Sequence, residues 1–264
     1  MPTVSIGDAD IYYEEKGNGP PLMLVPGLAG SGAFFLSQVP EFSRHFRTIV
    51  HDHRGAGRST HSRITYSVAR MADDTLRLMD ALGVDRAHLV GHSTGGAIGQ
   101  VIALDHPERL RSLVLSATWA GPDPYFRRMF ESRKQTLLDS GIEAYLRASS
   151  LMQSTPKWVS ENDDFLTELH RVTAASAAPI DVIASRIDAI LDHDCRSRLP
   201  QITVPTLVIV ARDDMITPAF YSEELASAIP GAKLIMLDGG GHFAPVIHSA
   251  PYNAAVGAFL RAVR

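Results

Sequence analysis

Short, nearly continuous runs of apolar residues, each bounded by turn-forming residues, recur along the whole of this 264-residue chain. Such runs are typical of strands that are buried on both faces of a parallel sheet, because helices cover the sheet on either side. The expected strands lie at residues 11–13, 22–25, 48–50, 88–90, 113–115, 207–210 and 234–237. This pattern favours folds that are built around a largely parallel sheet.

Amphipathic segments lie between these runs. In residues 68–82, apolar side chains recur at steps of three and four, and Gly83 ends the pattern. Further helices are expected at residues 97–104, which a His-Pro pair follows, and at residues 251–262. The alternation of strands and helices predicts an α/β fold with a mostly parallel, doubly wound sheet.

The stretch from residue 121 to residue 199 departs from this alternation. It contains no convincing strand, but apolar residues recur at helical spacing in three places. The three patterns start at Phe126, Phe165 and Ile180. We therefore expect a core of residues 1–120 and 200–264, with a helical cap of residues 121–199 inserted between two strands.

The composition argues against partners that need a strong charge or an apolar anchor. The chain is 45% hydrophobic and 20% charged with a net charge of -4, so it lacks the positive field of a nucleic-acid-binding protein. No apolar run approaches the roughly 18 residues of a membrane helix, and residues 1–8 do not resemble a signal peptide. We therefore expect a cytoplasmic enzyme with a small-molecule substrate and without nucleic-acid or membrane partners. Whether it forms a homo-oligomer stays open.

The single cysteine, Cys195, excludes an intrachain disulfide and a cysteine-rich metal cluster. Two short clusters, His-Asp-His at residues 51–53 and His-Asp-Cys at residues 193–195, contain metal-ligating side chains. Zinc needs three or four convergent ligands, and neither cluster shows them. We interpret the first as the end of a strand and the second as a linker, so that the sequence predicts neither a metal nor another cofactor.

The sequence Gly-His-Ser-Thr-Gly at residues 91–95 lies between a buried strand and an apolar helix. A serine on such a tight strand-to-helix turn is exposed above the sheet, and small neighbours permit the close approach of the backbone. The five-residue pattern alone also fits a glycine-rich turn with a surface serine. Its position favours a nucleophile, Ser93, and its spacing does not fit the three glycines of a dinucleotide-binding loop.

An acid and then a histidine follow the nucleophile in hydrolases that carry this turn. The acid belongs in a loop after a later strand, where open α/β sheets bind their ligands. Asp213 and Asp214 both follow the strand at residues 207–210, so that both are candidates.

Only His242 and His248 lie beyond these two carboxylates. His242 follows three glycines directly after the strand at residues 234–237, in a loop that can bring its imidazole over Ser93. His248 precedes the last helix and is interpreted as a surface or capping residue. We expect His242 to remove the serine proton while a carboxylate orients and stabilises the imidazole.

The sequence Pro-Gly-Leu-Ala-Gly at residues 26–30 follows the first long buried strand. In hydrolases with this turn, backbone N–H groups from such a loop and from the residue after the nucleophile bind the oxyanion. This assigns the oxyanion hole to the N–H groups of Leu28 and Thr94. The alternative is a plain turn from a strand into a loop.

Taken together, these segments resemble the α/β-hydrolase superfamily over nearly the whole chain. The match rests on residues 26–28, 52–59 and 91–95 and on Asp214 with His242. The chain looks most like the 3-oxoadipate enol-lactonases and the aminoacrylate hydrolases of pyrimidine breakdown, although many relatives have His-Gly where this chain has Pro-Gly. The resemblance implies that Asp214, three residues after a small residue, is the acid, with Asp213 as a solvent-facing charge. It also implies that residues 52–59 shape a loop beside the site.

These residues predict a serine hydrolase that cleaves a small carboxylic ester or lactone through an acyl-enzyme on Ser93. Carbon–carbon hydrolysis of a diketone and aminoacrylate-type C–N hydrolysis use the same three side chains and stay open. So does a non-catalytic receptor for a small ligand on the same fold. Haloalkane dehalogenases and epoxide hydrolases are disfavoured, because they have an aspartate at the position of Ser93.

If the expected cap covers the sheet, its side chains shape the substrate pocket, although each of them equally fits a role in packing. Candidates for an apolar lining are Trp119, Tyr125, Phe126, Phe130, Met152 and Trp158. Candidates for binding a substrate carboxylate are Arg127, Arg128, Arg133 and Arg147.

Overall fold

A single eight-stranded sheet runs through residues 2–263, which are the residues that the computed structural model describes. The spatial order of the strands is β1-β2-β4-β3-β5-β6-β7-β8. The strands are β1 (Thr3–Ser5), β2 (Asp10–Lys16), β3 (Pro21–Val25), β4 (Arg47–His51), β5 (Ala87–His92), β6 (Leu110–Ser116), β7 (Thr206–Ala211) and β8 (Lys233–Leu237).

The six strands from β4 to β8 in this order are parallel, and β1 and β2 pair antiparallel at one edge. This confirms the mostly parallel α/β-hydrolase sheet. All seven expected strands are present. The sequence did not indicate β1, because its three residues lie at the sheet edge, partly or fully exposed, and form no apolar run.

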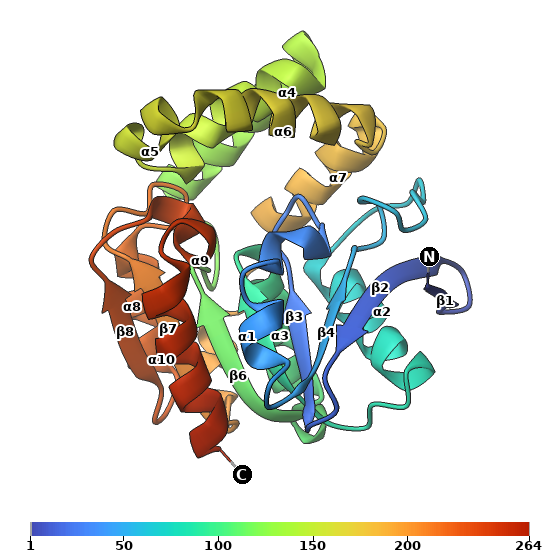
Figure 1. Ribbon diagram of the computed structural model, residues 1–264, viewed down its shortest axis with the longest axis vertical. Coiled ribbons are helices and arrows are strands. Elements are labelled where there is room, and N and C mark those ends of the chain that lie inside the picture. The colour runs from blue at the N-terminus through green and yellow to red at the C-terminus, as the bar shows by residue number, and fades with distance from the viewer. Residues whose placement is uncertain (1, 264) are drawn as a thin grey trace.

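Helices cover both faces of the sheet, as Figure 1 shows. Side chains of a strand point alternately to the two faces, so that Leu22 and Leu24 of β3 belong to one apolar core and Met23 and Val25 to the other. The first core includes residues of α1 (Val39–Phe42) and α10 (Ser249–Ala262). The second includes residues of α2 (Val68–Ala81), α3 (Thr94–Asp105) and α8 (Ala219–Ala228). Burial on both faces explains why the strands are apolar along their whole length.

Short helical turns complete these connections. They are the 3-10 turns η1 (Gly32–Phe35), η2 (Pro107–Arg109), η3 (Arg196–Gln201) and η4 (Gly241–Phe243), and the one-turn helix α9 (Ala244–Ile247).

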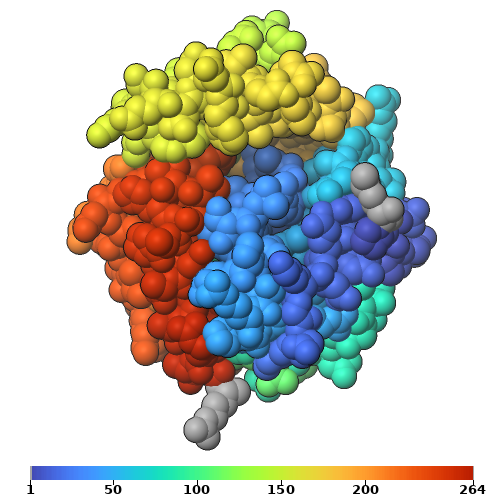
Figure 2. Space-filling view, viewed as in Figure 1, coloured from blue at the N-terminus to red at the C-terminus, as the bar shows by residue number. Residues whose placement is uncertain are grey.

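Between β6 and β7, the chain forms helices and no strand over residues 117–205, all of which the structure describes. Four helices, α4 (Pro124–Gln153), α5 (Pro156–Glu161), α6 (Asp163–Ala175) and α7 (Ile180–Leu191), form a helical layer of residues 124–191. This layer lies across one end of the sheet in Figure 1, and Figure 2 shows a hollow between it and the core. The division of the chain into a core and a cap at residues 121 and 199 stays a prediction.

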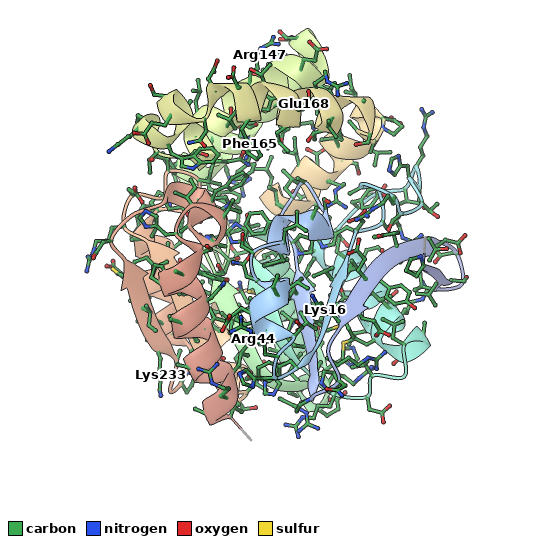
Figure 3. The ribbon with its side chains drawn as sticks, in the orientation of Figure 1. Lys16, Arg44, Arg147, Phe165, Glu168 and Lys233 are labelled. Atoms are coloured by element: carbon green, nitrogen blue, oxygen red, sulfur yellow. The ribbon has the colours of Figure 1, made fainter. Side chains whose placement is uncertain are left out.

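The pattern in α6 predicts the helix correctly, but its apolar stripe is exposed. Phe165, Leu169 and Val172 all lie at the surface, and the buried side chain of the helix is Leu166. Figure 3 places Phe165 on the edge of the helical layer that is next to the core, and Arg147 on its outer side. The spacing of apolar residues therefore reported the helix and not the face that it buries.

No helix in residues 2–263 combines the length and the apolar character that crossing a membrane requires.

Candidate active site

Ser93 lies at the turn from β5 into α3, with an unusual backbone conformation. Its φ is 55° and its ψ is -119°, a region that side-chain-bearing residues avoid at a cost of about 1–3 kcal/mol. Two hydrogen bonds hold this conformation: the Ser93 N–H donates to the Ser116 carbonyl at 2.8 Å, and the Thr118 hydroxyl donates to the Ser93 carbonyl at 2.8 Å. The turn therefore fixes where the serine side chain points.

The two glycines of the turn are needed because backbone atoms approach them closely. A Cβ at Gly95 would lie 2.0 Å from the carbonyl oxygen of Val25, the last residue of β3. A Cβ at Gly91 would lie 2.1 Å from the carbonyl oxygen of Gly95. A side chain fits at neither position. With glycine at both, the first turn of α3 can pack directly against the end of the sheet.

The loop of residues 26–30 packs against the serine. Its chain turns with a hydrogen bond from the Gly30 N–H to the Gly27 carbonyl at 2.9 Å. A Cβ at Gly27 would lie 3.1 Å from Ser93 Cβ and 3.6 Å from Ser93 Oγ, so glycine leaves the space beside the hydroxyl open.

The two residues whose N–H groups the sequence assigns to an oxyanion hole are Thr94, which directly follows Ser93, and Leu28, which follows the Gly27 that packs against Ser93. Thr94 is the first residue of α3, where N–H groups have no acceptor inside the helix. Within residues 2–263, the N–H of Leu28 also donates to no backbone or side-chain acceptor. Two free donors beside a serine can bind a developing negative charge.

Asp214 and His242 form a buried hydrogen-bonded pair. Asp214 follows β7, His242 lies in η4, and their Oδ2 and Nδ1 atoms are 2.8 Å apart. The N–H groups of Ile216 and Thr217 donate to Asp214 Oδ1 at 2.8 and 2.9 Å, and the Thr217 hydroxyl donates to Oδ2 at 3.0 Å. These donors fix the position of the carboxyl group, which can hold a histidine with its proton on Nδ1.

The His242 ring reaches the serine turn. Its centroid is 4.8 Å from that of His92, the neighbour of Ser93. The hydrogen bonds of this ring in residues 2–263 use Nδ1, which leaves Nε2 without a protein partner. Contacts between a nucleophile and its base are often loose until a substrate is bound.

Asp213 is exposed, as expected, and also has hydrogen-bond partners in the protein. Its side chain accepts hydrogen bonds from the N–H groups of Gly240 and Gly241 at 3.3 and 2.9 Å. It thus holds the loop that carries His242, and both adjacent carboxylates act on the same loop. His248 is exposed, as predicted.

The sequence did not single out His92, the second residue of the turn. Its buried ring stacks on Phe34 at 4.5 Å, and its Nδ1 lies 3.1 Å from the Ser116 hydroxyl. Burial, and then the nearby His242, lower the pKa of His92 well below its usual value. A neutral His92 adds no charge beside the His242 ring. The pattern Gly-x-Ser-x-Gly places no restriction on this position, so no signal could have found it.

Neither histidine cluster forms a metal site. Among residues 2–263, no group of three or more His, Cys, Asp or Glu side chains is arranged to hold a metal ion.

Asp52 accepts hydrogen bonds from the N–H of Gly32 at 2.8 Å and from the Arg58 side chain at 2.8 Å. Residues 52–59 therefore brace the loop after β3, beside the site.

The candidate arginines do not surround Ser93. Arg133 is buried and donates to the hydroxyls of Tyr145 and Ser149 at 3.0 and 3.2 Å within the helical layer. The side chains of Arg127, Arg128 and Arg147 are exposed.

The aromatic candidates divide into two groups. Trp119, Phe126 and Phe130 are fully buried and stack in series, with centroids 4.6 and 4.4 Å apart. They pack the start of α4 onto the core, which is the structural alternative to a pocket lining. Of the rest, Tyr125 is exposed, and Met152 and Trp158 are partly buried.

Comparison with known proteins agrees with this geometry. A family model described as the alpha/beta hydrolase fold matches residues 20–249. A protein of Azorhizobium caulinodans that carries the provisional name carbamate hydrolase RutD is 41% identical over 242 residues, which are 92% of this chain and 91% of that protein.

Two solved structures are similar over nearly their whole length. The enol-lactonase from Burkholderia xenovorans LB400 has a TM-score of 0.91 and 27% identity, covering 98% of this chain and 100% of its own. A hydrolase from Pseudomonas aeruginosa PA01 has a TM-score of 0.89 and 32% identity, covering 98% and 97%. The chain therefore belongs to the α/β-hydrolase family, and it is a hydrolase. The resemblance that the sequence motifs indicated is confirmed.

Proposed function

We propose that this protein hydrolyses a small carboxylic ester or lactone through an acyl-enzyme on Ser93. The observation that carries the proposal is the strained backbone of Ser93 next to the buried Asp214–His242 pair. A hydroxyl, a base and an orienting carboxylate are the three parts that nucleophilic acyl transfer needs.

In the first step, Ser93 Oγ bonds to the carbonyl carbon while His242 Nε2 accepts the serine proton. The carbonyl oxygen becomes an oxyanion, which the N–H groups of Leu28 and Thr94 bind. The oxyanion then collapses, the bond to the leaving oxygen breaks, and the alcohol takes the proton from His242. A lactone opens in the same way, with its alcohol still attached.

In the second step, water replaces the alcohol. His242 accepts a proton from the water as its oxygen bonds to the acyl carbon, and it returns that proton to Ser93 Oγ when the ester bond breaks. The products are a carboxylic acid and the free enzyme. Asp214 is held in place by its hydrogen bonds and stabilises the imidazolium that forms in each step.

Cleavage of a carbamate C–N bond is the second candidate, and the names of similar proteins favour it. Proteins of Azorhizobium caulinodans and Caulobacter that are 41% and 40% identical to this chain are both provisionally named carbamate hydrolases. The same residues would act, with His242 giving its proton to a nitrogen instead of an oxygen.

A fluorophosphonate probe tests the nucleophile directly, because it reacts with an activated serine hydroxyl. We expect the modified peptide to contain Ser93 and Ser93→Ala to lose both labelling and turnover. The matched control is Ser160→Ala, an exposed serine on α5, which should keep both. Labelling of another residue, or turnover by folded Ser93→Ala, would refute the proposal. Rates on p-nitrophenyl acetate, a γ-lactone and a methyl carbamate then separate the two substrate classes.

A further inference from the structure

Arg186 of α7 reaches from the helical layer to the loop of residues 26–30. Its side chain is among the largest that are fully buried. The guanidinium donates to the Leu28 carbonyl at 2.9 Å, to the Arg54 carbonyl at 2.6 Å and to His53 Nδ1 at 3.1 Å. Figure 1 shows α7 descending from the helical layer toward the strands. One side chain of the helical layer thus joins two loops at the end of the sheet.

This buried cation has no acidic partner. No carboxylate in residues 2–263 lies within salt-bridge distance of Arg186, whereas the buried Arg54 is paired with Asp74 at 2.8 Å and with Asp8 at 2.8 Å. Burial lowers the pKa of Arg186 to about 10, so that its side chain is still charged at neutral pH. Burying an unpaired charge is costly unless its hydrogen bonds are made. Its acceptors are two carbonyls and an imidazole, which makes the loop itself part of the charge's environment.

The Leu28 carbonyl is a sensitive point in the loop. It belongs to the central peptide of the turn that the Gly30–Gly27 hydrogen bond closes. Rotation of the central peptide changes the type of a turn through ψ of its first central residue, here Leu28, and φ of its second, here Ala29. A donor fixed on that oxygen prevents the rotation.

Two further features involve Gly30, the last residue of the same loop. The N–H of His53 donates to the Gly30 carbonyl at 2.8 Å, so the residue that Arg186 holds through its ring also holds the loop through its backbone. A Cβ at Gly30 would lie 2.9 Å from the Arg186 Nη2 atom. Glycine at this position therefore leaves room for the guanidinium.

We propose that Arg186 is a positioning residue for the oxyanion hole. It fixes the central peptide of the loop and with it ψ of Leu28, so that the loop keeps the conformation that presents the Leu28 N–H to the oxyanion, and it places a positive charge next to that peptide. The inference rests on the proposed reaction at Ser93 and extends it, because it makes turnover depend on a residue from the helical layer. Arg186 does not contact the substrate, so its effect falls on kcat and not on KM.

The test replaces Arg186 by lysine and by glutamine and measures kcat and KM on p-nitrophenyl acetate. A displaced donor at a reacting centre costs about 10- to 100-fold, so we expect a loss of this size in kcat for Arg186→Gln with little change in KM. Arg186→Lys keeps the charge but lacks the planar fork that spans three acceptors, and it should lose less. The rate of fluorophosphonate labelling at Ser93 should fall in parallel with kcat.

Lys134→Gln is the matched control. Lys134 of α4 binds Asp188 of α7 at 2.6 Å and anchors the same helix without touching the loop. If Arg186 served only to hold α7 in place, Lys134→Gln would lower kcat equally, and the inference would be wrong. A kcat equal to that of the parent enzyme in folded Arg186→Lys and Arg186→Gln would also overturn it.

Chemical rescue covers the case in which truncation disturbs folding. Arg186→Ala should regain part of its kcat when guanidinium chloride is added at millimolar concentration, because the free ion restores donors to the vacated space. Failure of rescue in a protein with a native circular dichroism spectrum would count against the inference. The proposed function is tested separately. It would fail if Ser93→Ala kept its turnover, and that result does not depend on the kinetics of the Arg186 variants.

Discussion

The end of the sheet and the helical layer above it are built in different ways. Ser93, Asp214 and His242 are each at most 5% exposed, and the backbone of the serine and the carboxylate of the acid are held by several short hydrogen bonds. In contrast, α6 exposes apolar side chains, and Phe165 is 54% exposed. The candidate catalytic residues are thus positioned by the ends of the strands and the turns that follow them.

Three contacts between the two regions involve loops at the end of the sheet. Arg186 binds the loop after β3, the Tyr125 hydroxyl donates to the Met215 carbonyl next to Asp214, and a Cβ at Gly241 would lie 2.9 Å from the Gln153 carbonyl. All three contacts involve loops that carry site residues.

The largest expected effect separates the two adjacent carboxylates at the end of the sheet. Asp214→Asn should lower kcat by about 10³–10⁴, because an amide at this position favours the wrong tautomer of His242. Asp213→Asn keeps an oxygen acceptor for the Gly241 N–H and should lower kcat by less than about tenfold. Steady-state kinetics on p-nitrophenyl acetate measure both. Equal losses would mean that the roles of the two carboxylates are not distinct.

A pair of glycine substitutions compares the packing of the two regions. Gly95→Ala places a Cβ 2.0 Å from a backbone oxygen and should lower the free energy of unfolding by about 3 kcal/mol or more, with loss of turnover. Gly141 of α4 also has a positive φ, 76°, but no atom lies within 4 Å of its Cβ position. Gly141→Ala should cost only backbone strain, about 1–3 kcal/mol, and leave kcat unchanged. Urea unfolding measures the free energies of unfolding of the two variants, and steady-state kinetics measure their kcat. A changed kcat in Gly141→Ala would contradict the prediction.

The sheet should also be the part of the molecule that acid destabilises. Burial lowers the pKa of His51 and of His88 to about 4, from 6.5 in the unfolded chain. The stability from these neutral histidines is fully present above pH 6.5 and is lost as the pH falls toward 4, because the unfolded chain then binds more protons. The loss is up to about 1.4 kcal/mol per pH unit for each histidine.

Urea unfolding at several pH values in this window measures the slope. The matched variant is His88→Gln. It should reduce the slope of the free energy of unfolding against pH by the contribution of one histidine. The helical layer contains one histidine, His170, and it is only partly buried. An equally steep slope in His88→Gln would assign the acid sensitivity to other groups.

The smallest expected effect lies on α6. Phe165→Ser should change the free energy of unfolding by about 0.5 kcal/mol or less, because the side chain is already exposed. Leu166→Ala, at the neighbouring buried position, should cost about 2–5 kcal/mol. Thermal and urea unfolding compare the two variants. A large loss for Phe165→Ser would show that this stripe is covered in solution.

The strands and the serine turn were predictable because both depend on local sequence. A strand buried on both faces must be apolar throughout, and a turn in which Gly95 touches Val25 must have glycine. The choice between Asp213 and Asp214 was not local. It required the family pattern, because both side chains follow the same strand, and the contact of Asp213 with Gly241 and that of Asp214 with His242 appear only in the folded chain.

The role of Arg186 and the exposed face of α6 could not be predicted for a related reason. An arginine among isoleucines on a helix usually extends to solvent, and three apolar residues at helical spacing usually face a core. Both expectations fail here because the position of the helical layer over the sheet decides them. That position depends on contacts between residues more than 100 apart, such as Arg186 with His53.

The backbone of Ser93 has a further consequence for how this chain evolves. Glycine would adopt the same φ and ψ without penalty, so replacing the proposed nucleophile by glycine would relieve backbone strain at this position. If Ser93 is the nucleophile, selection for activity keeps a serine at a position where glycine would be more stable. In a descendant that no longer needs the reaction, Ser93→Gly would remove the activity and at the same time relieve backbone strain.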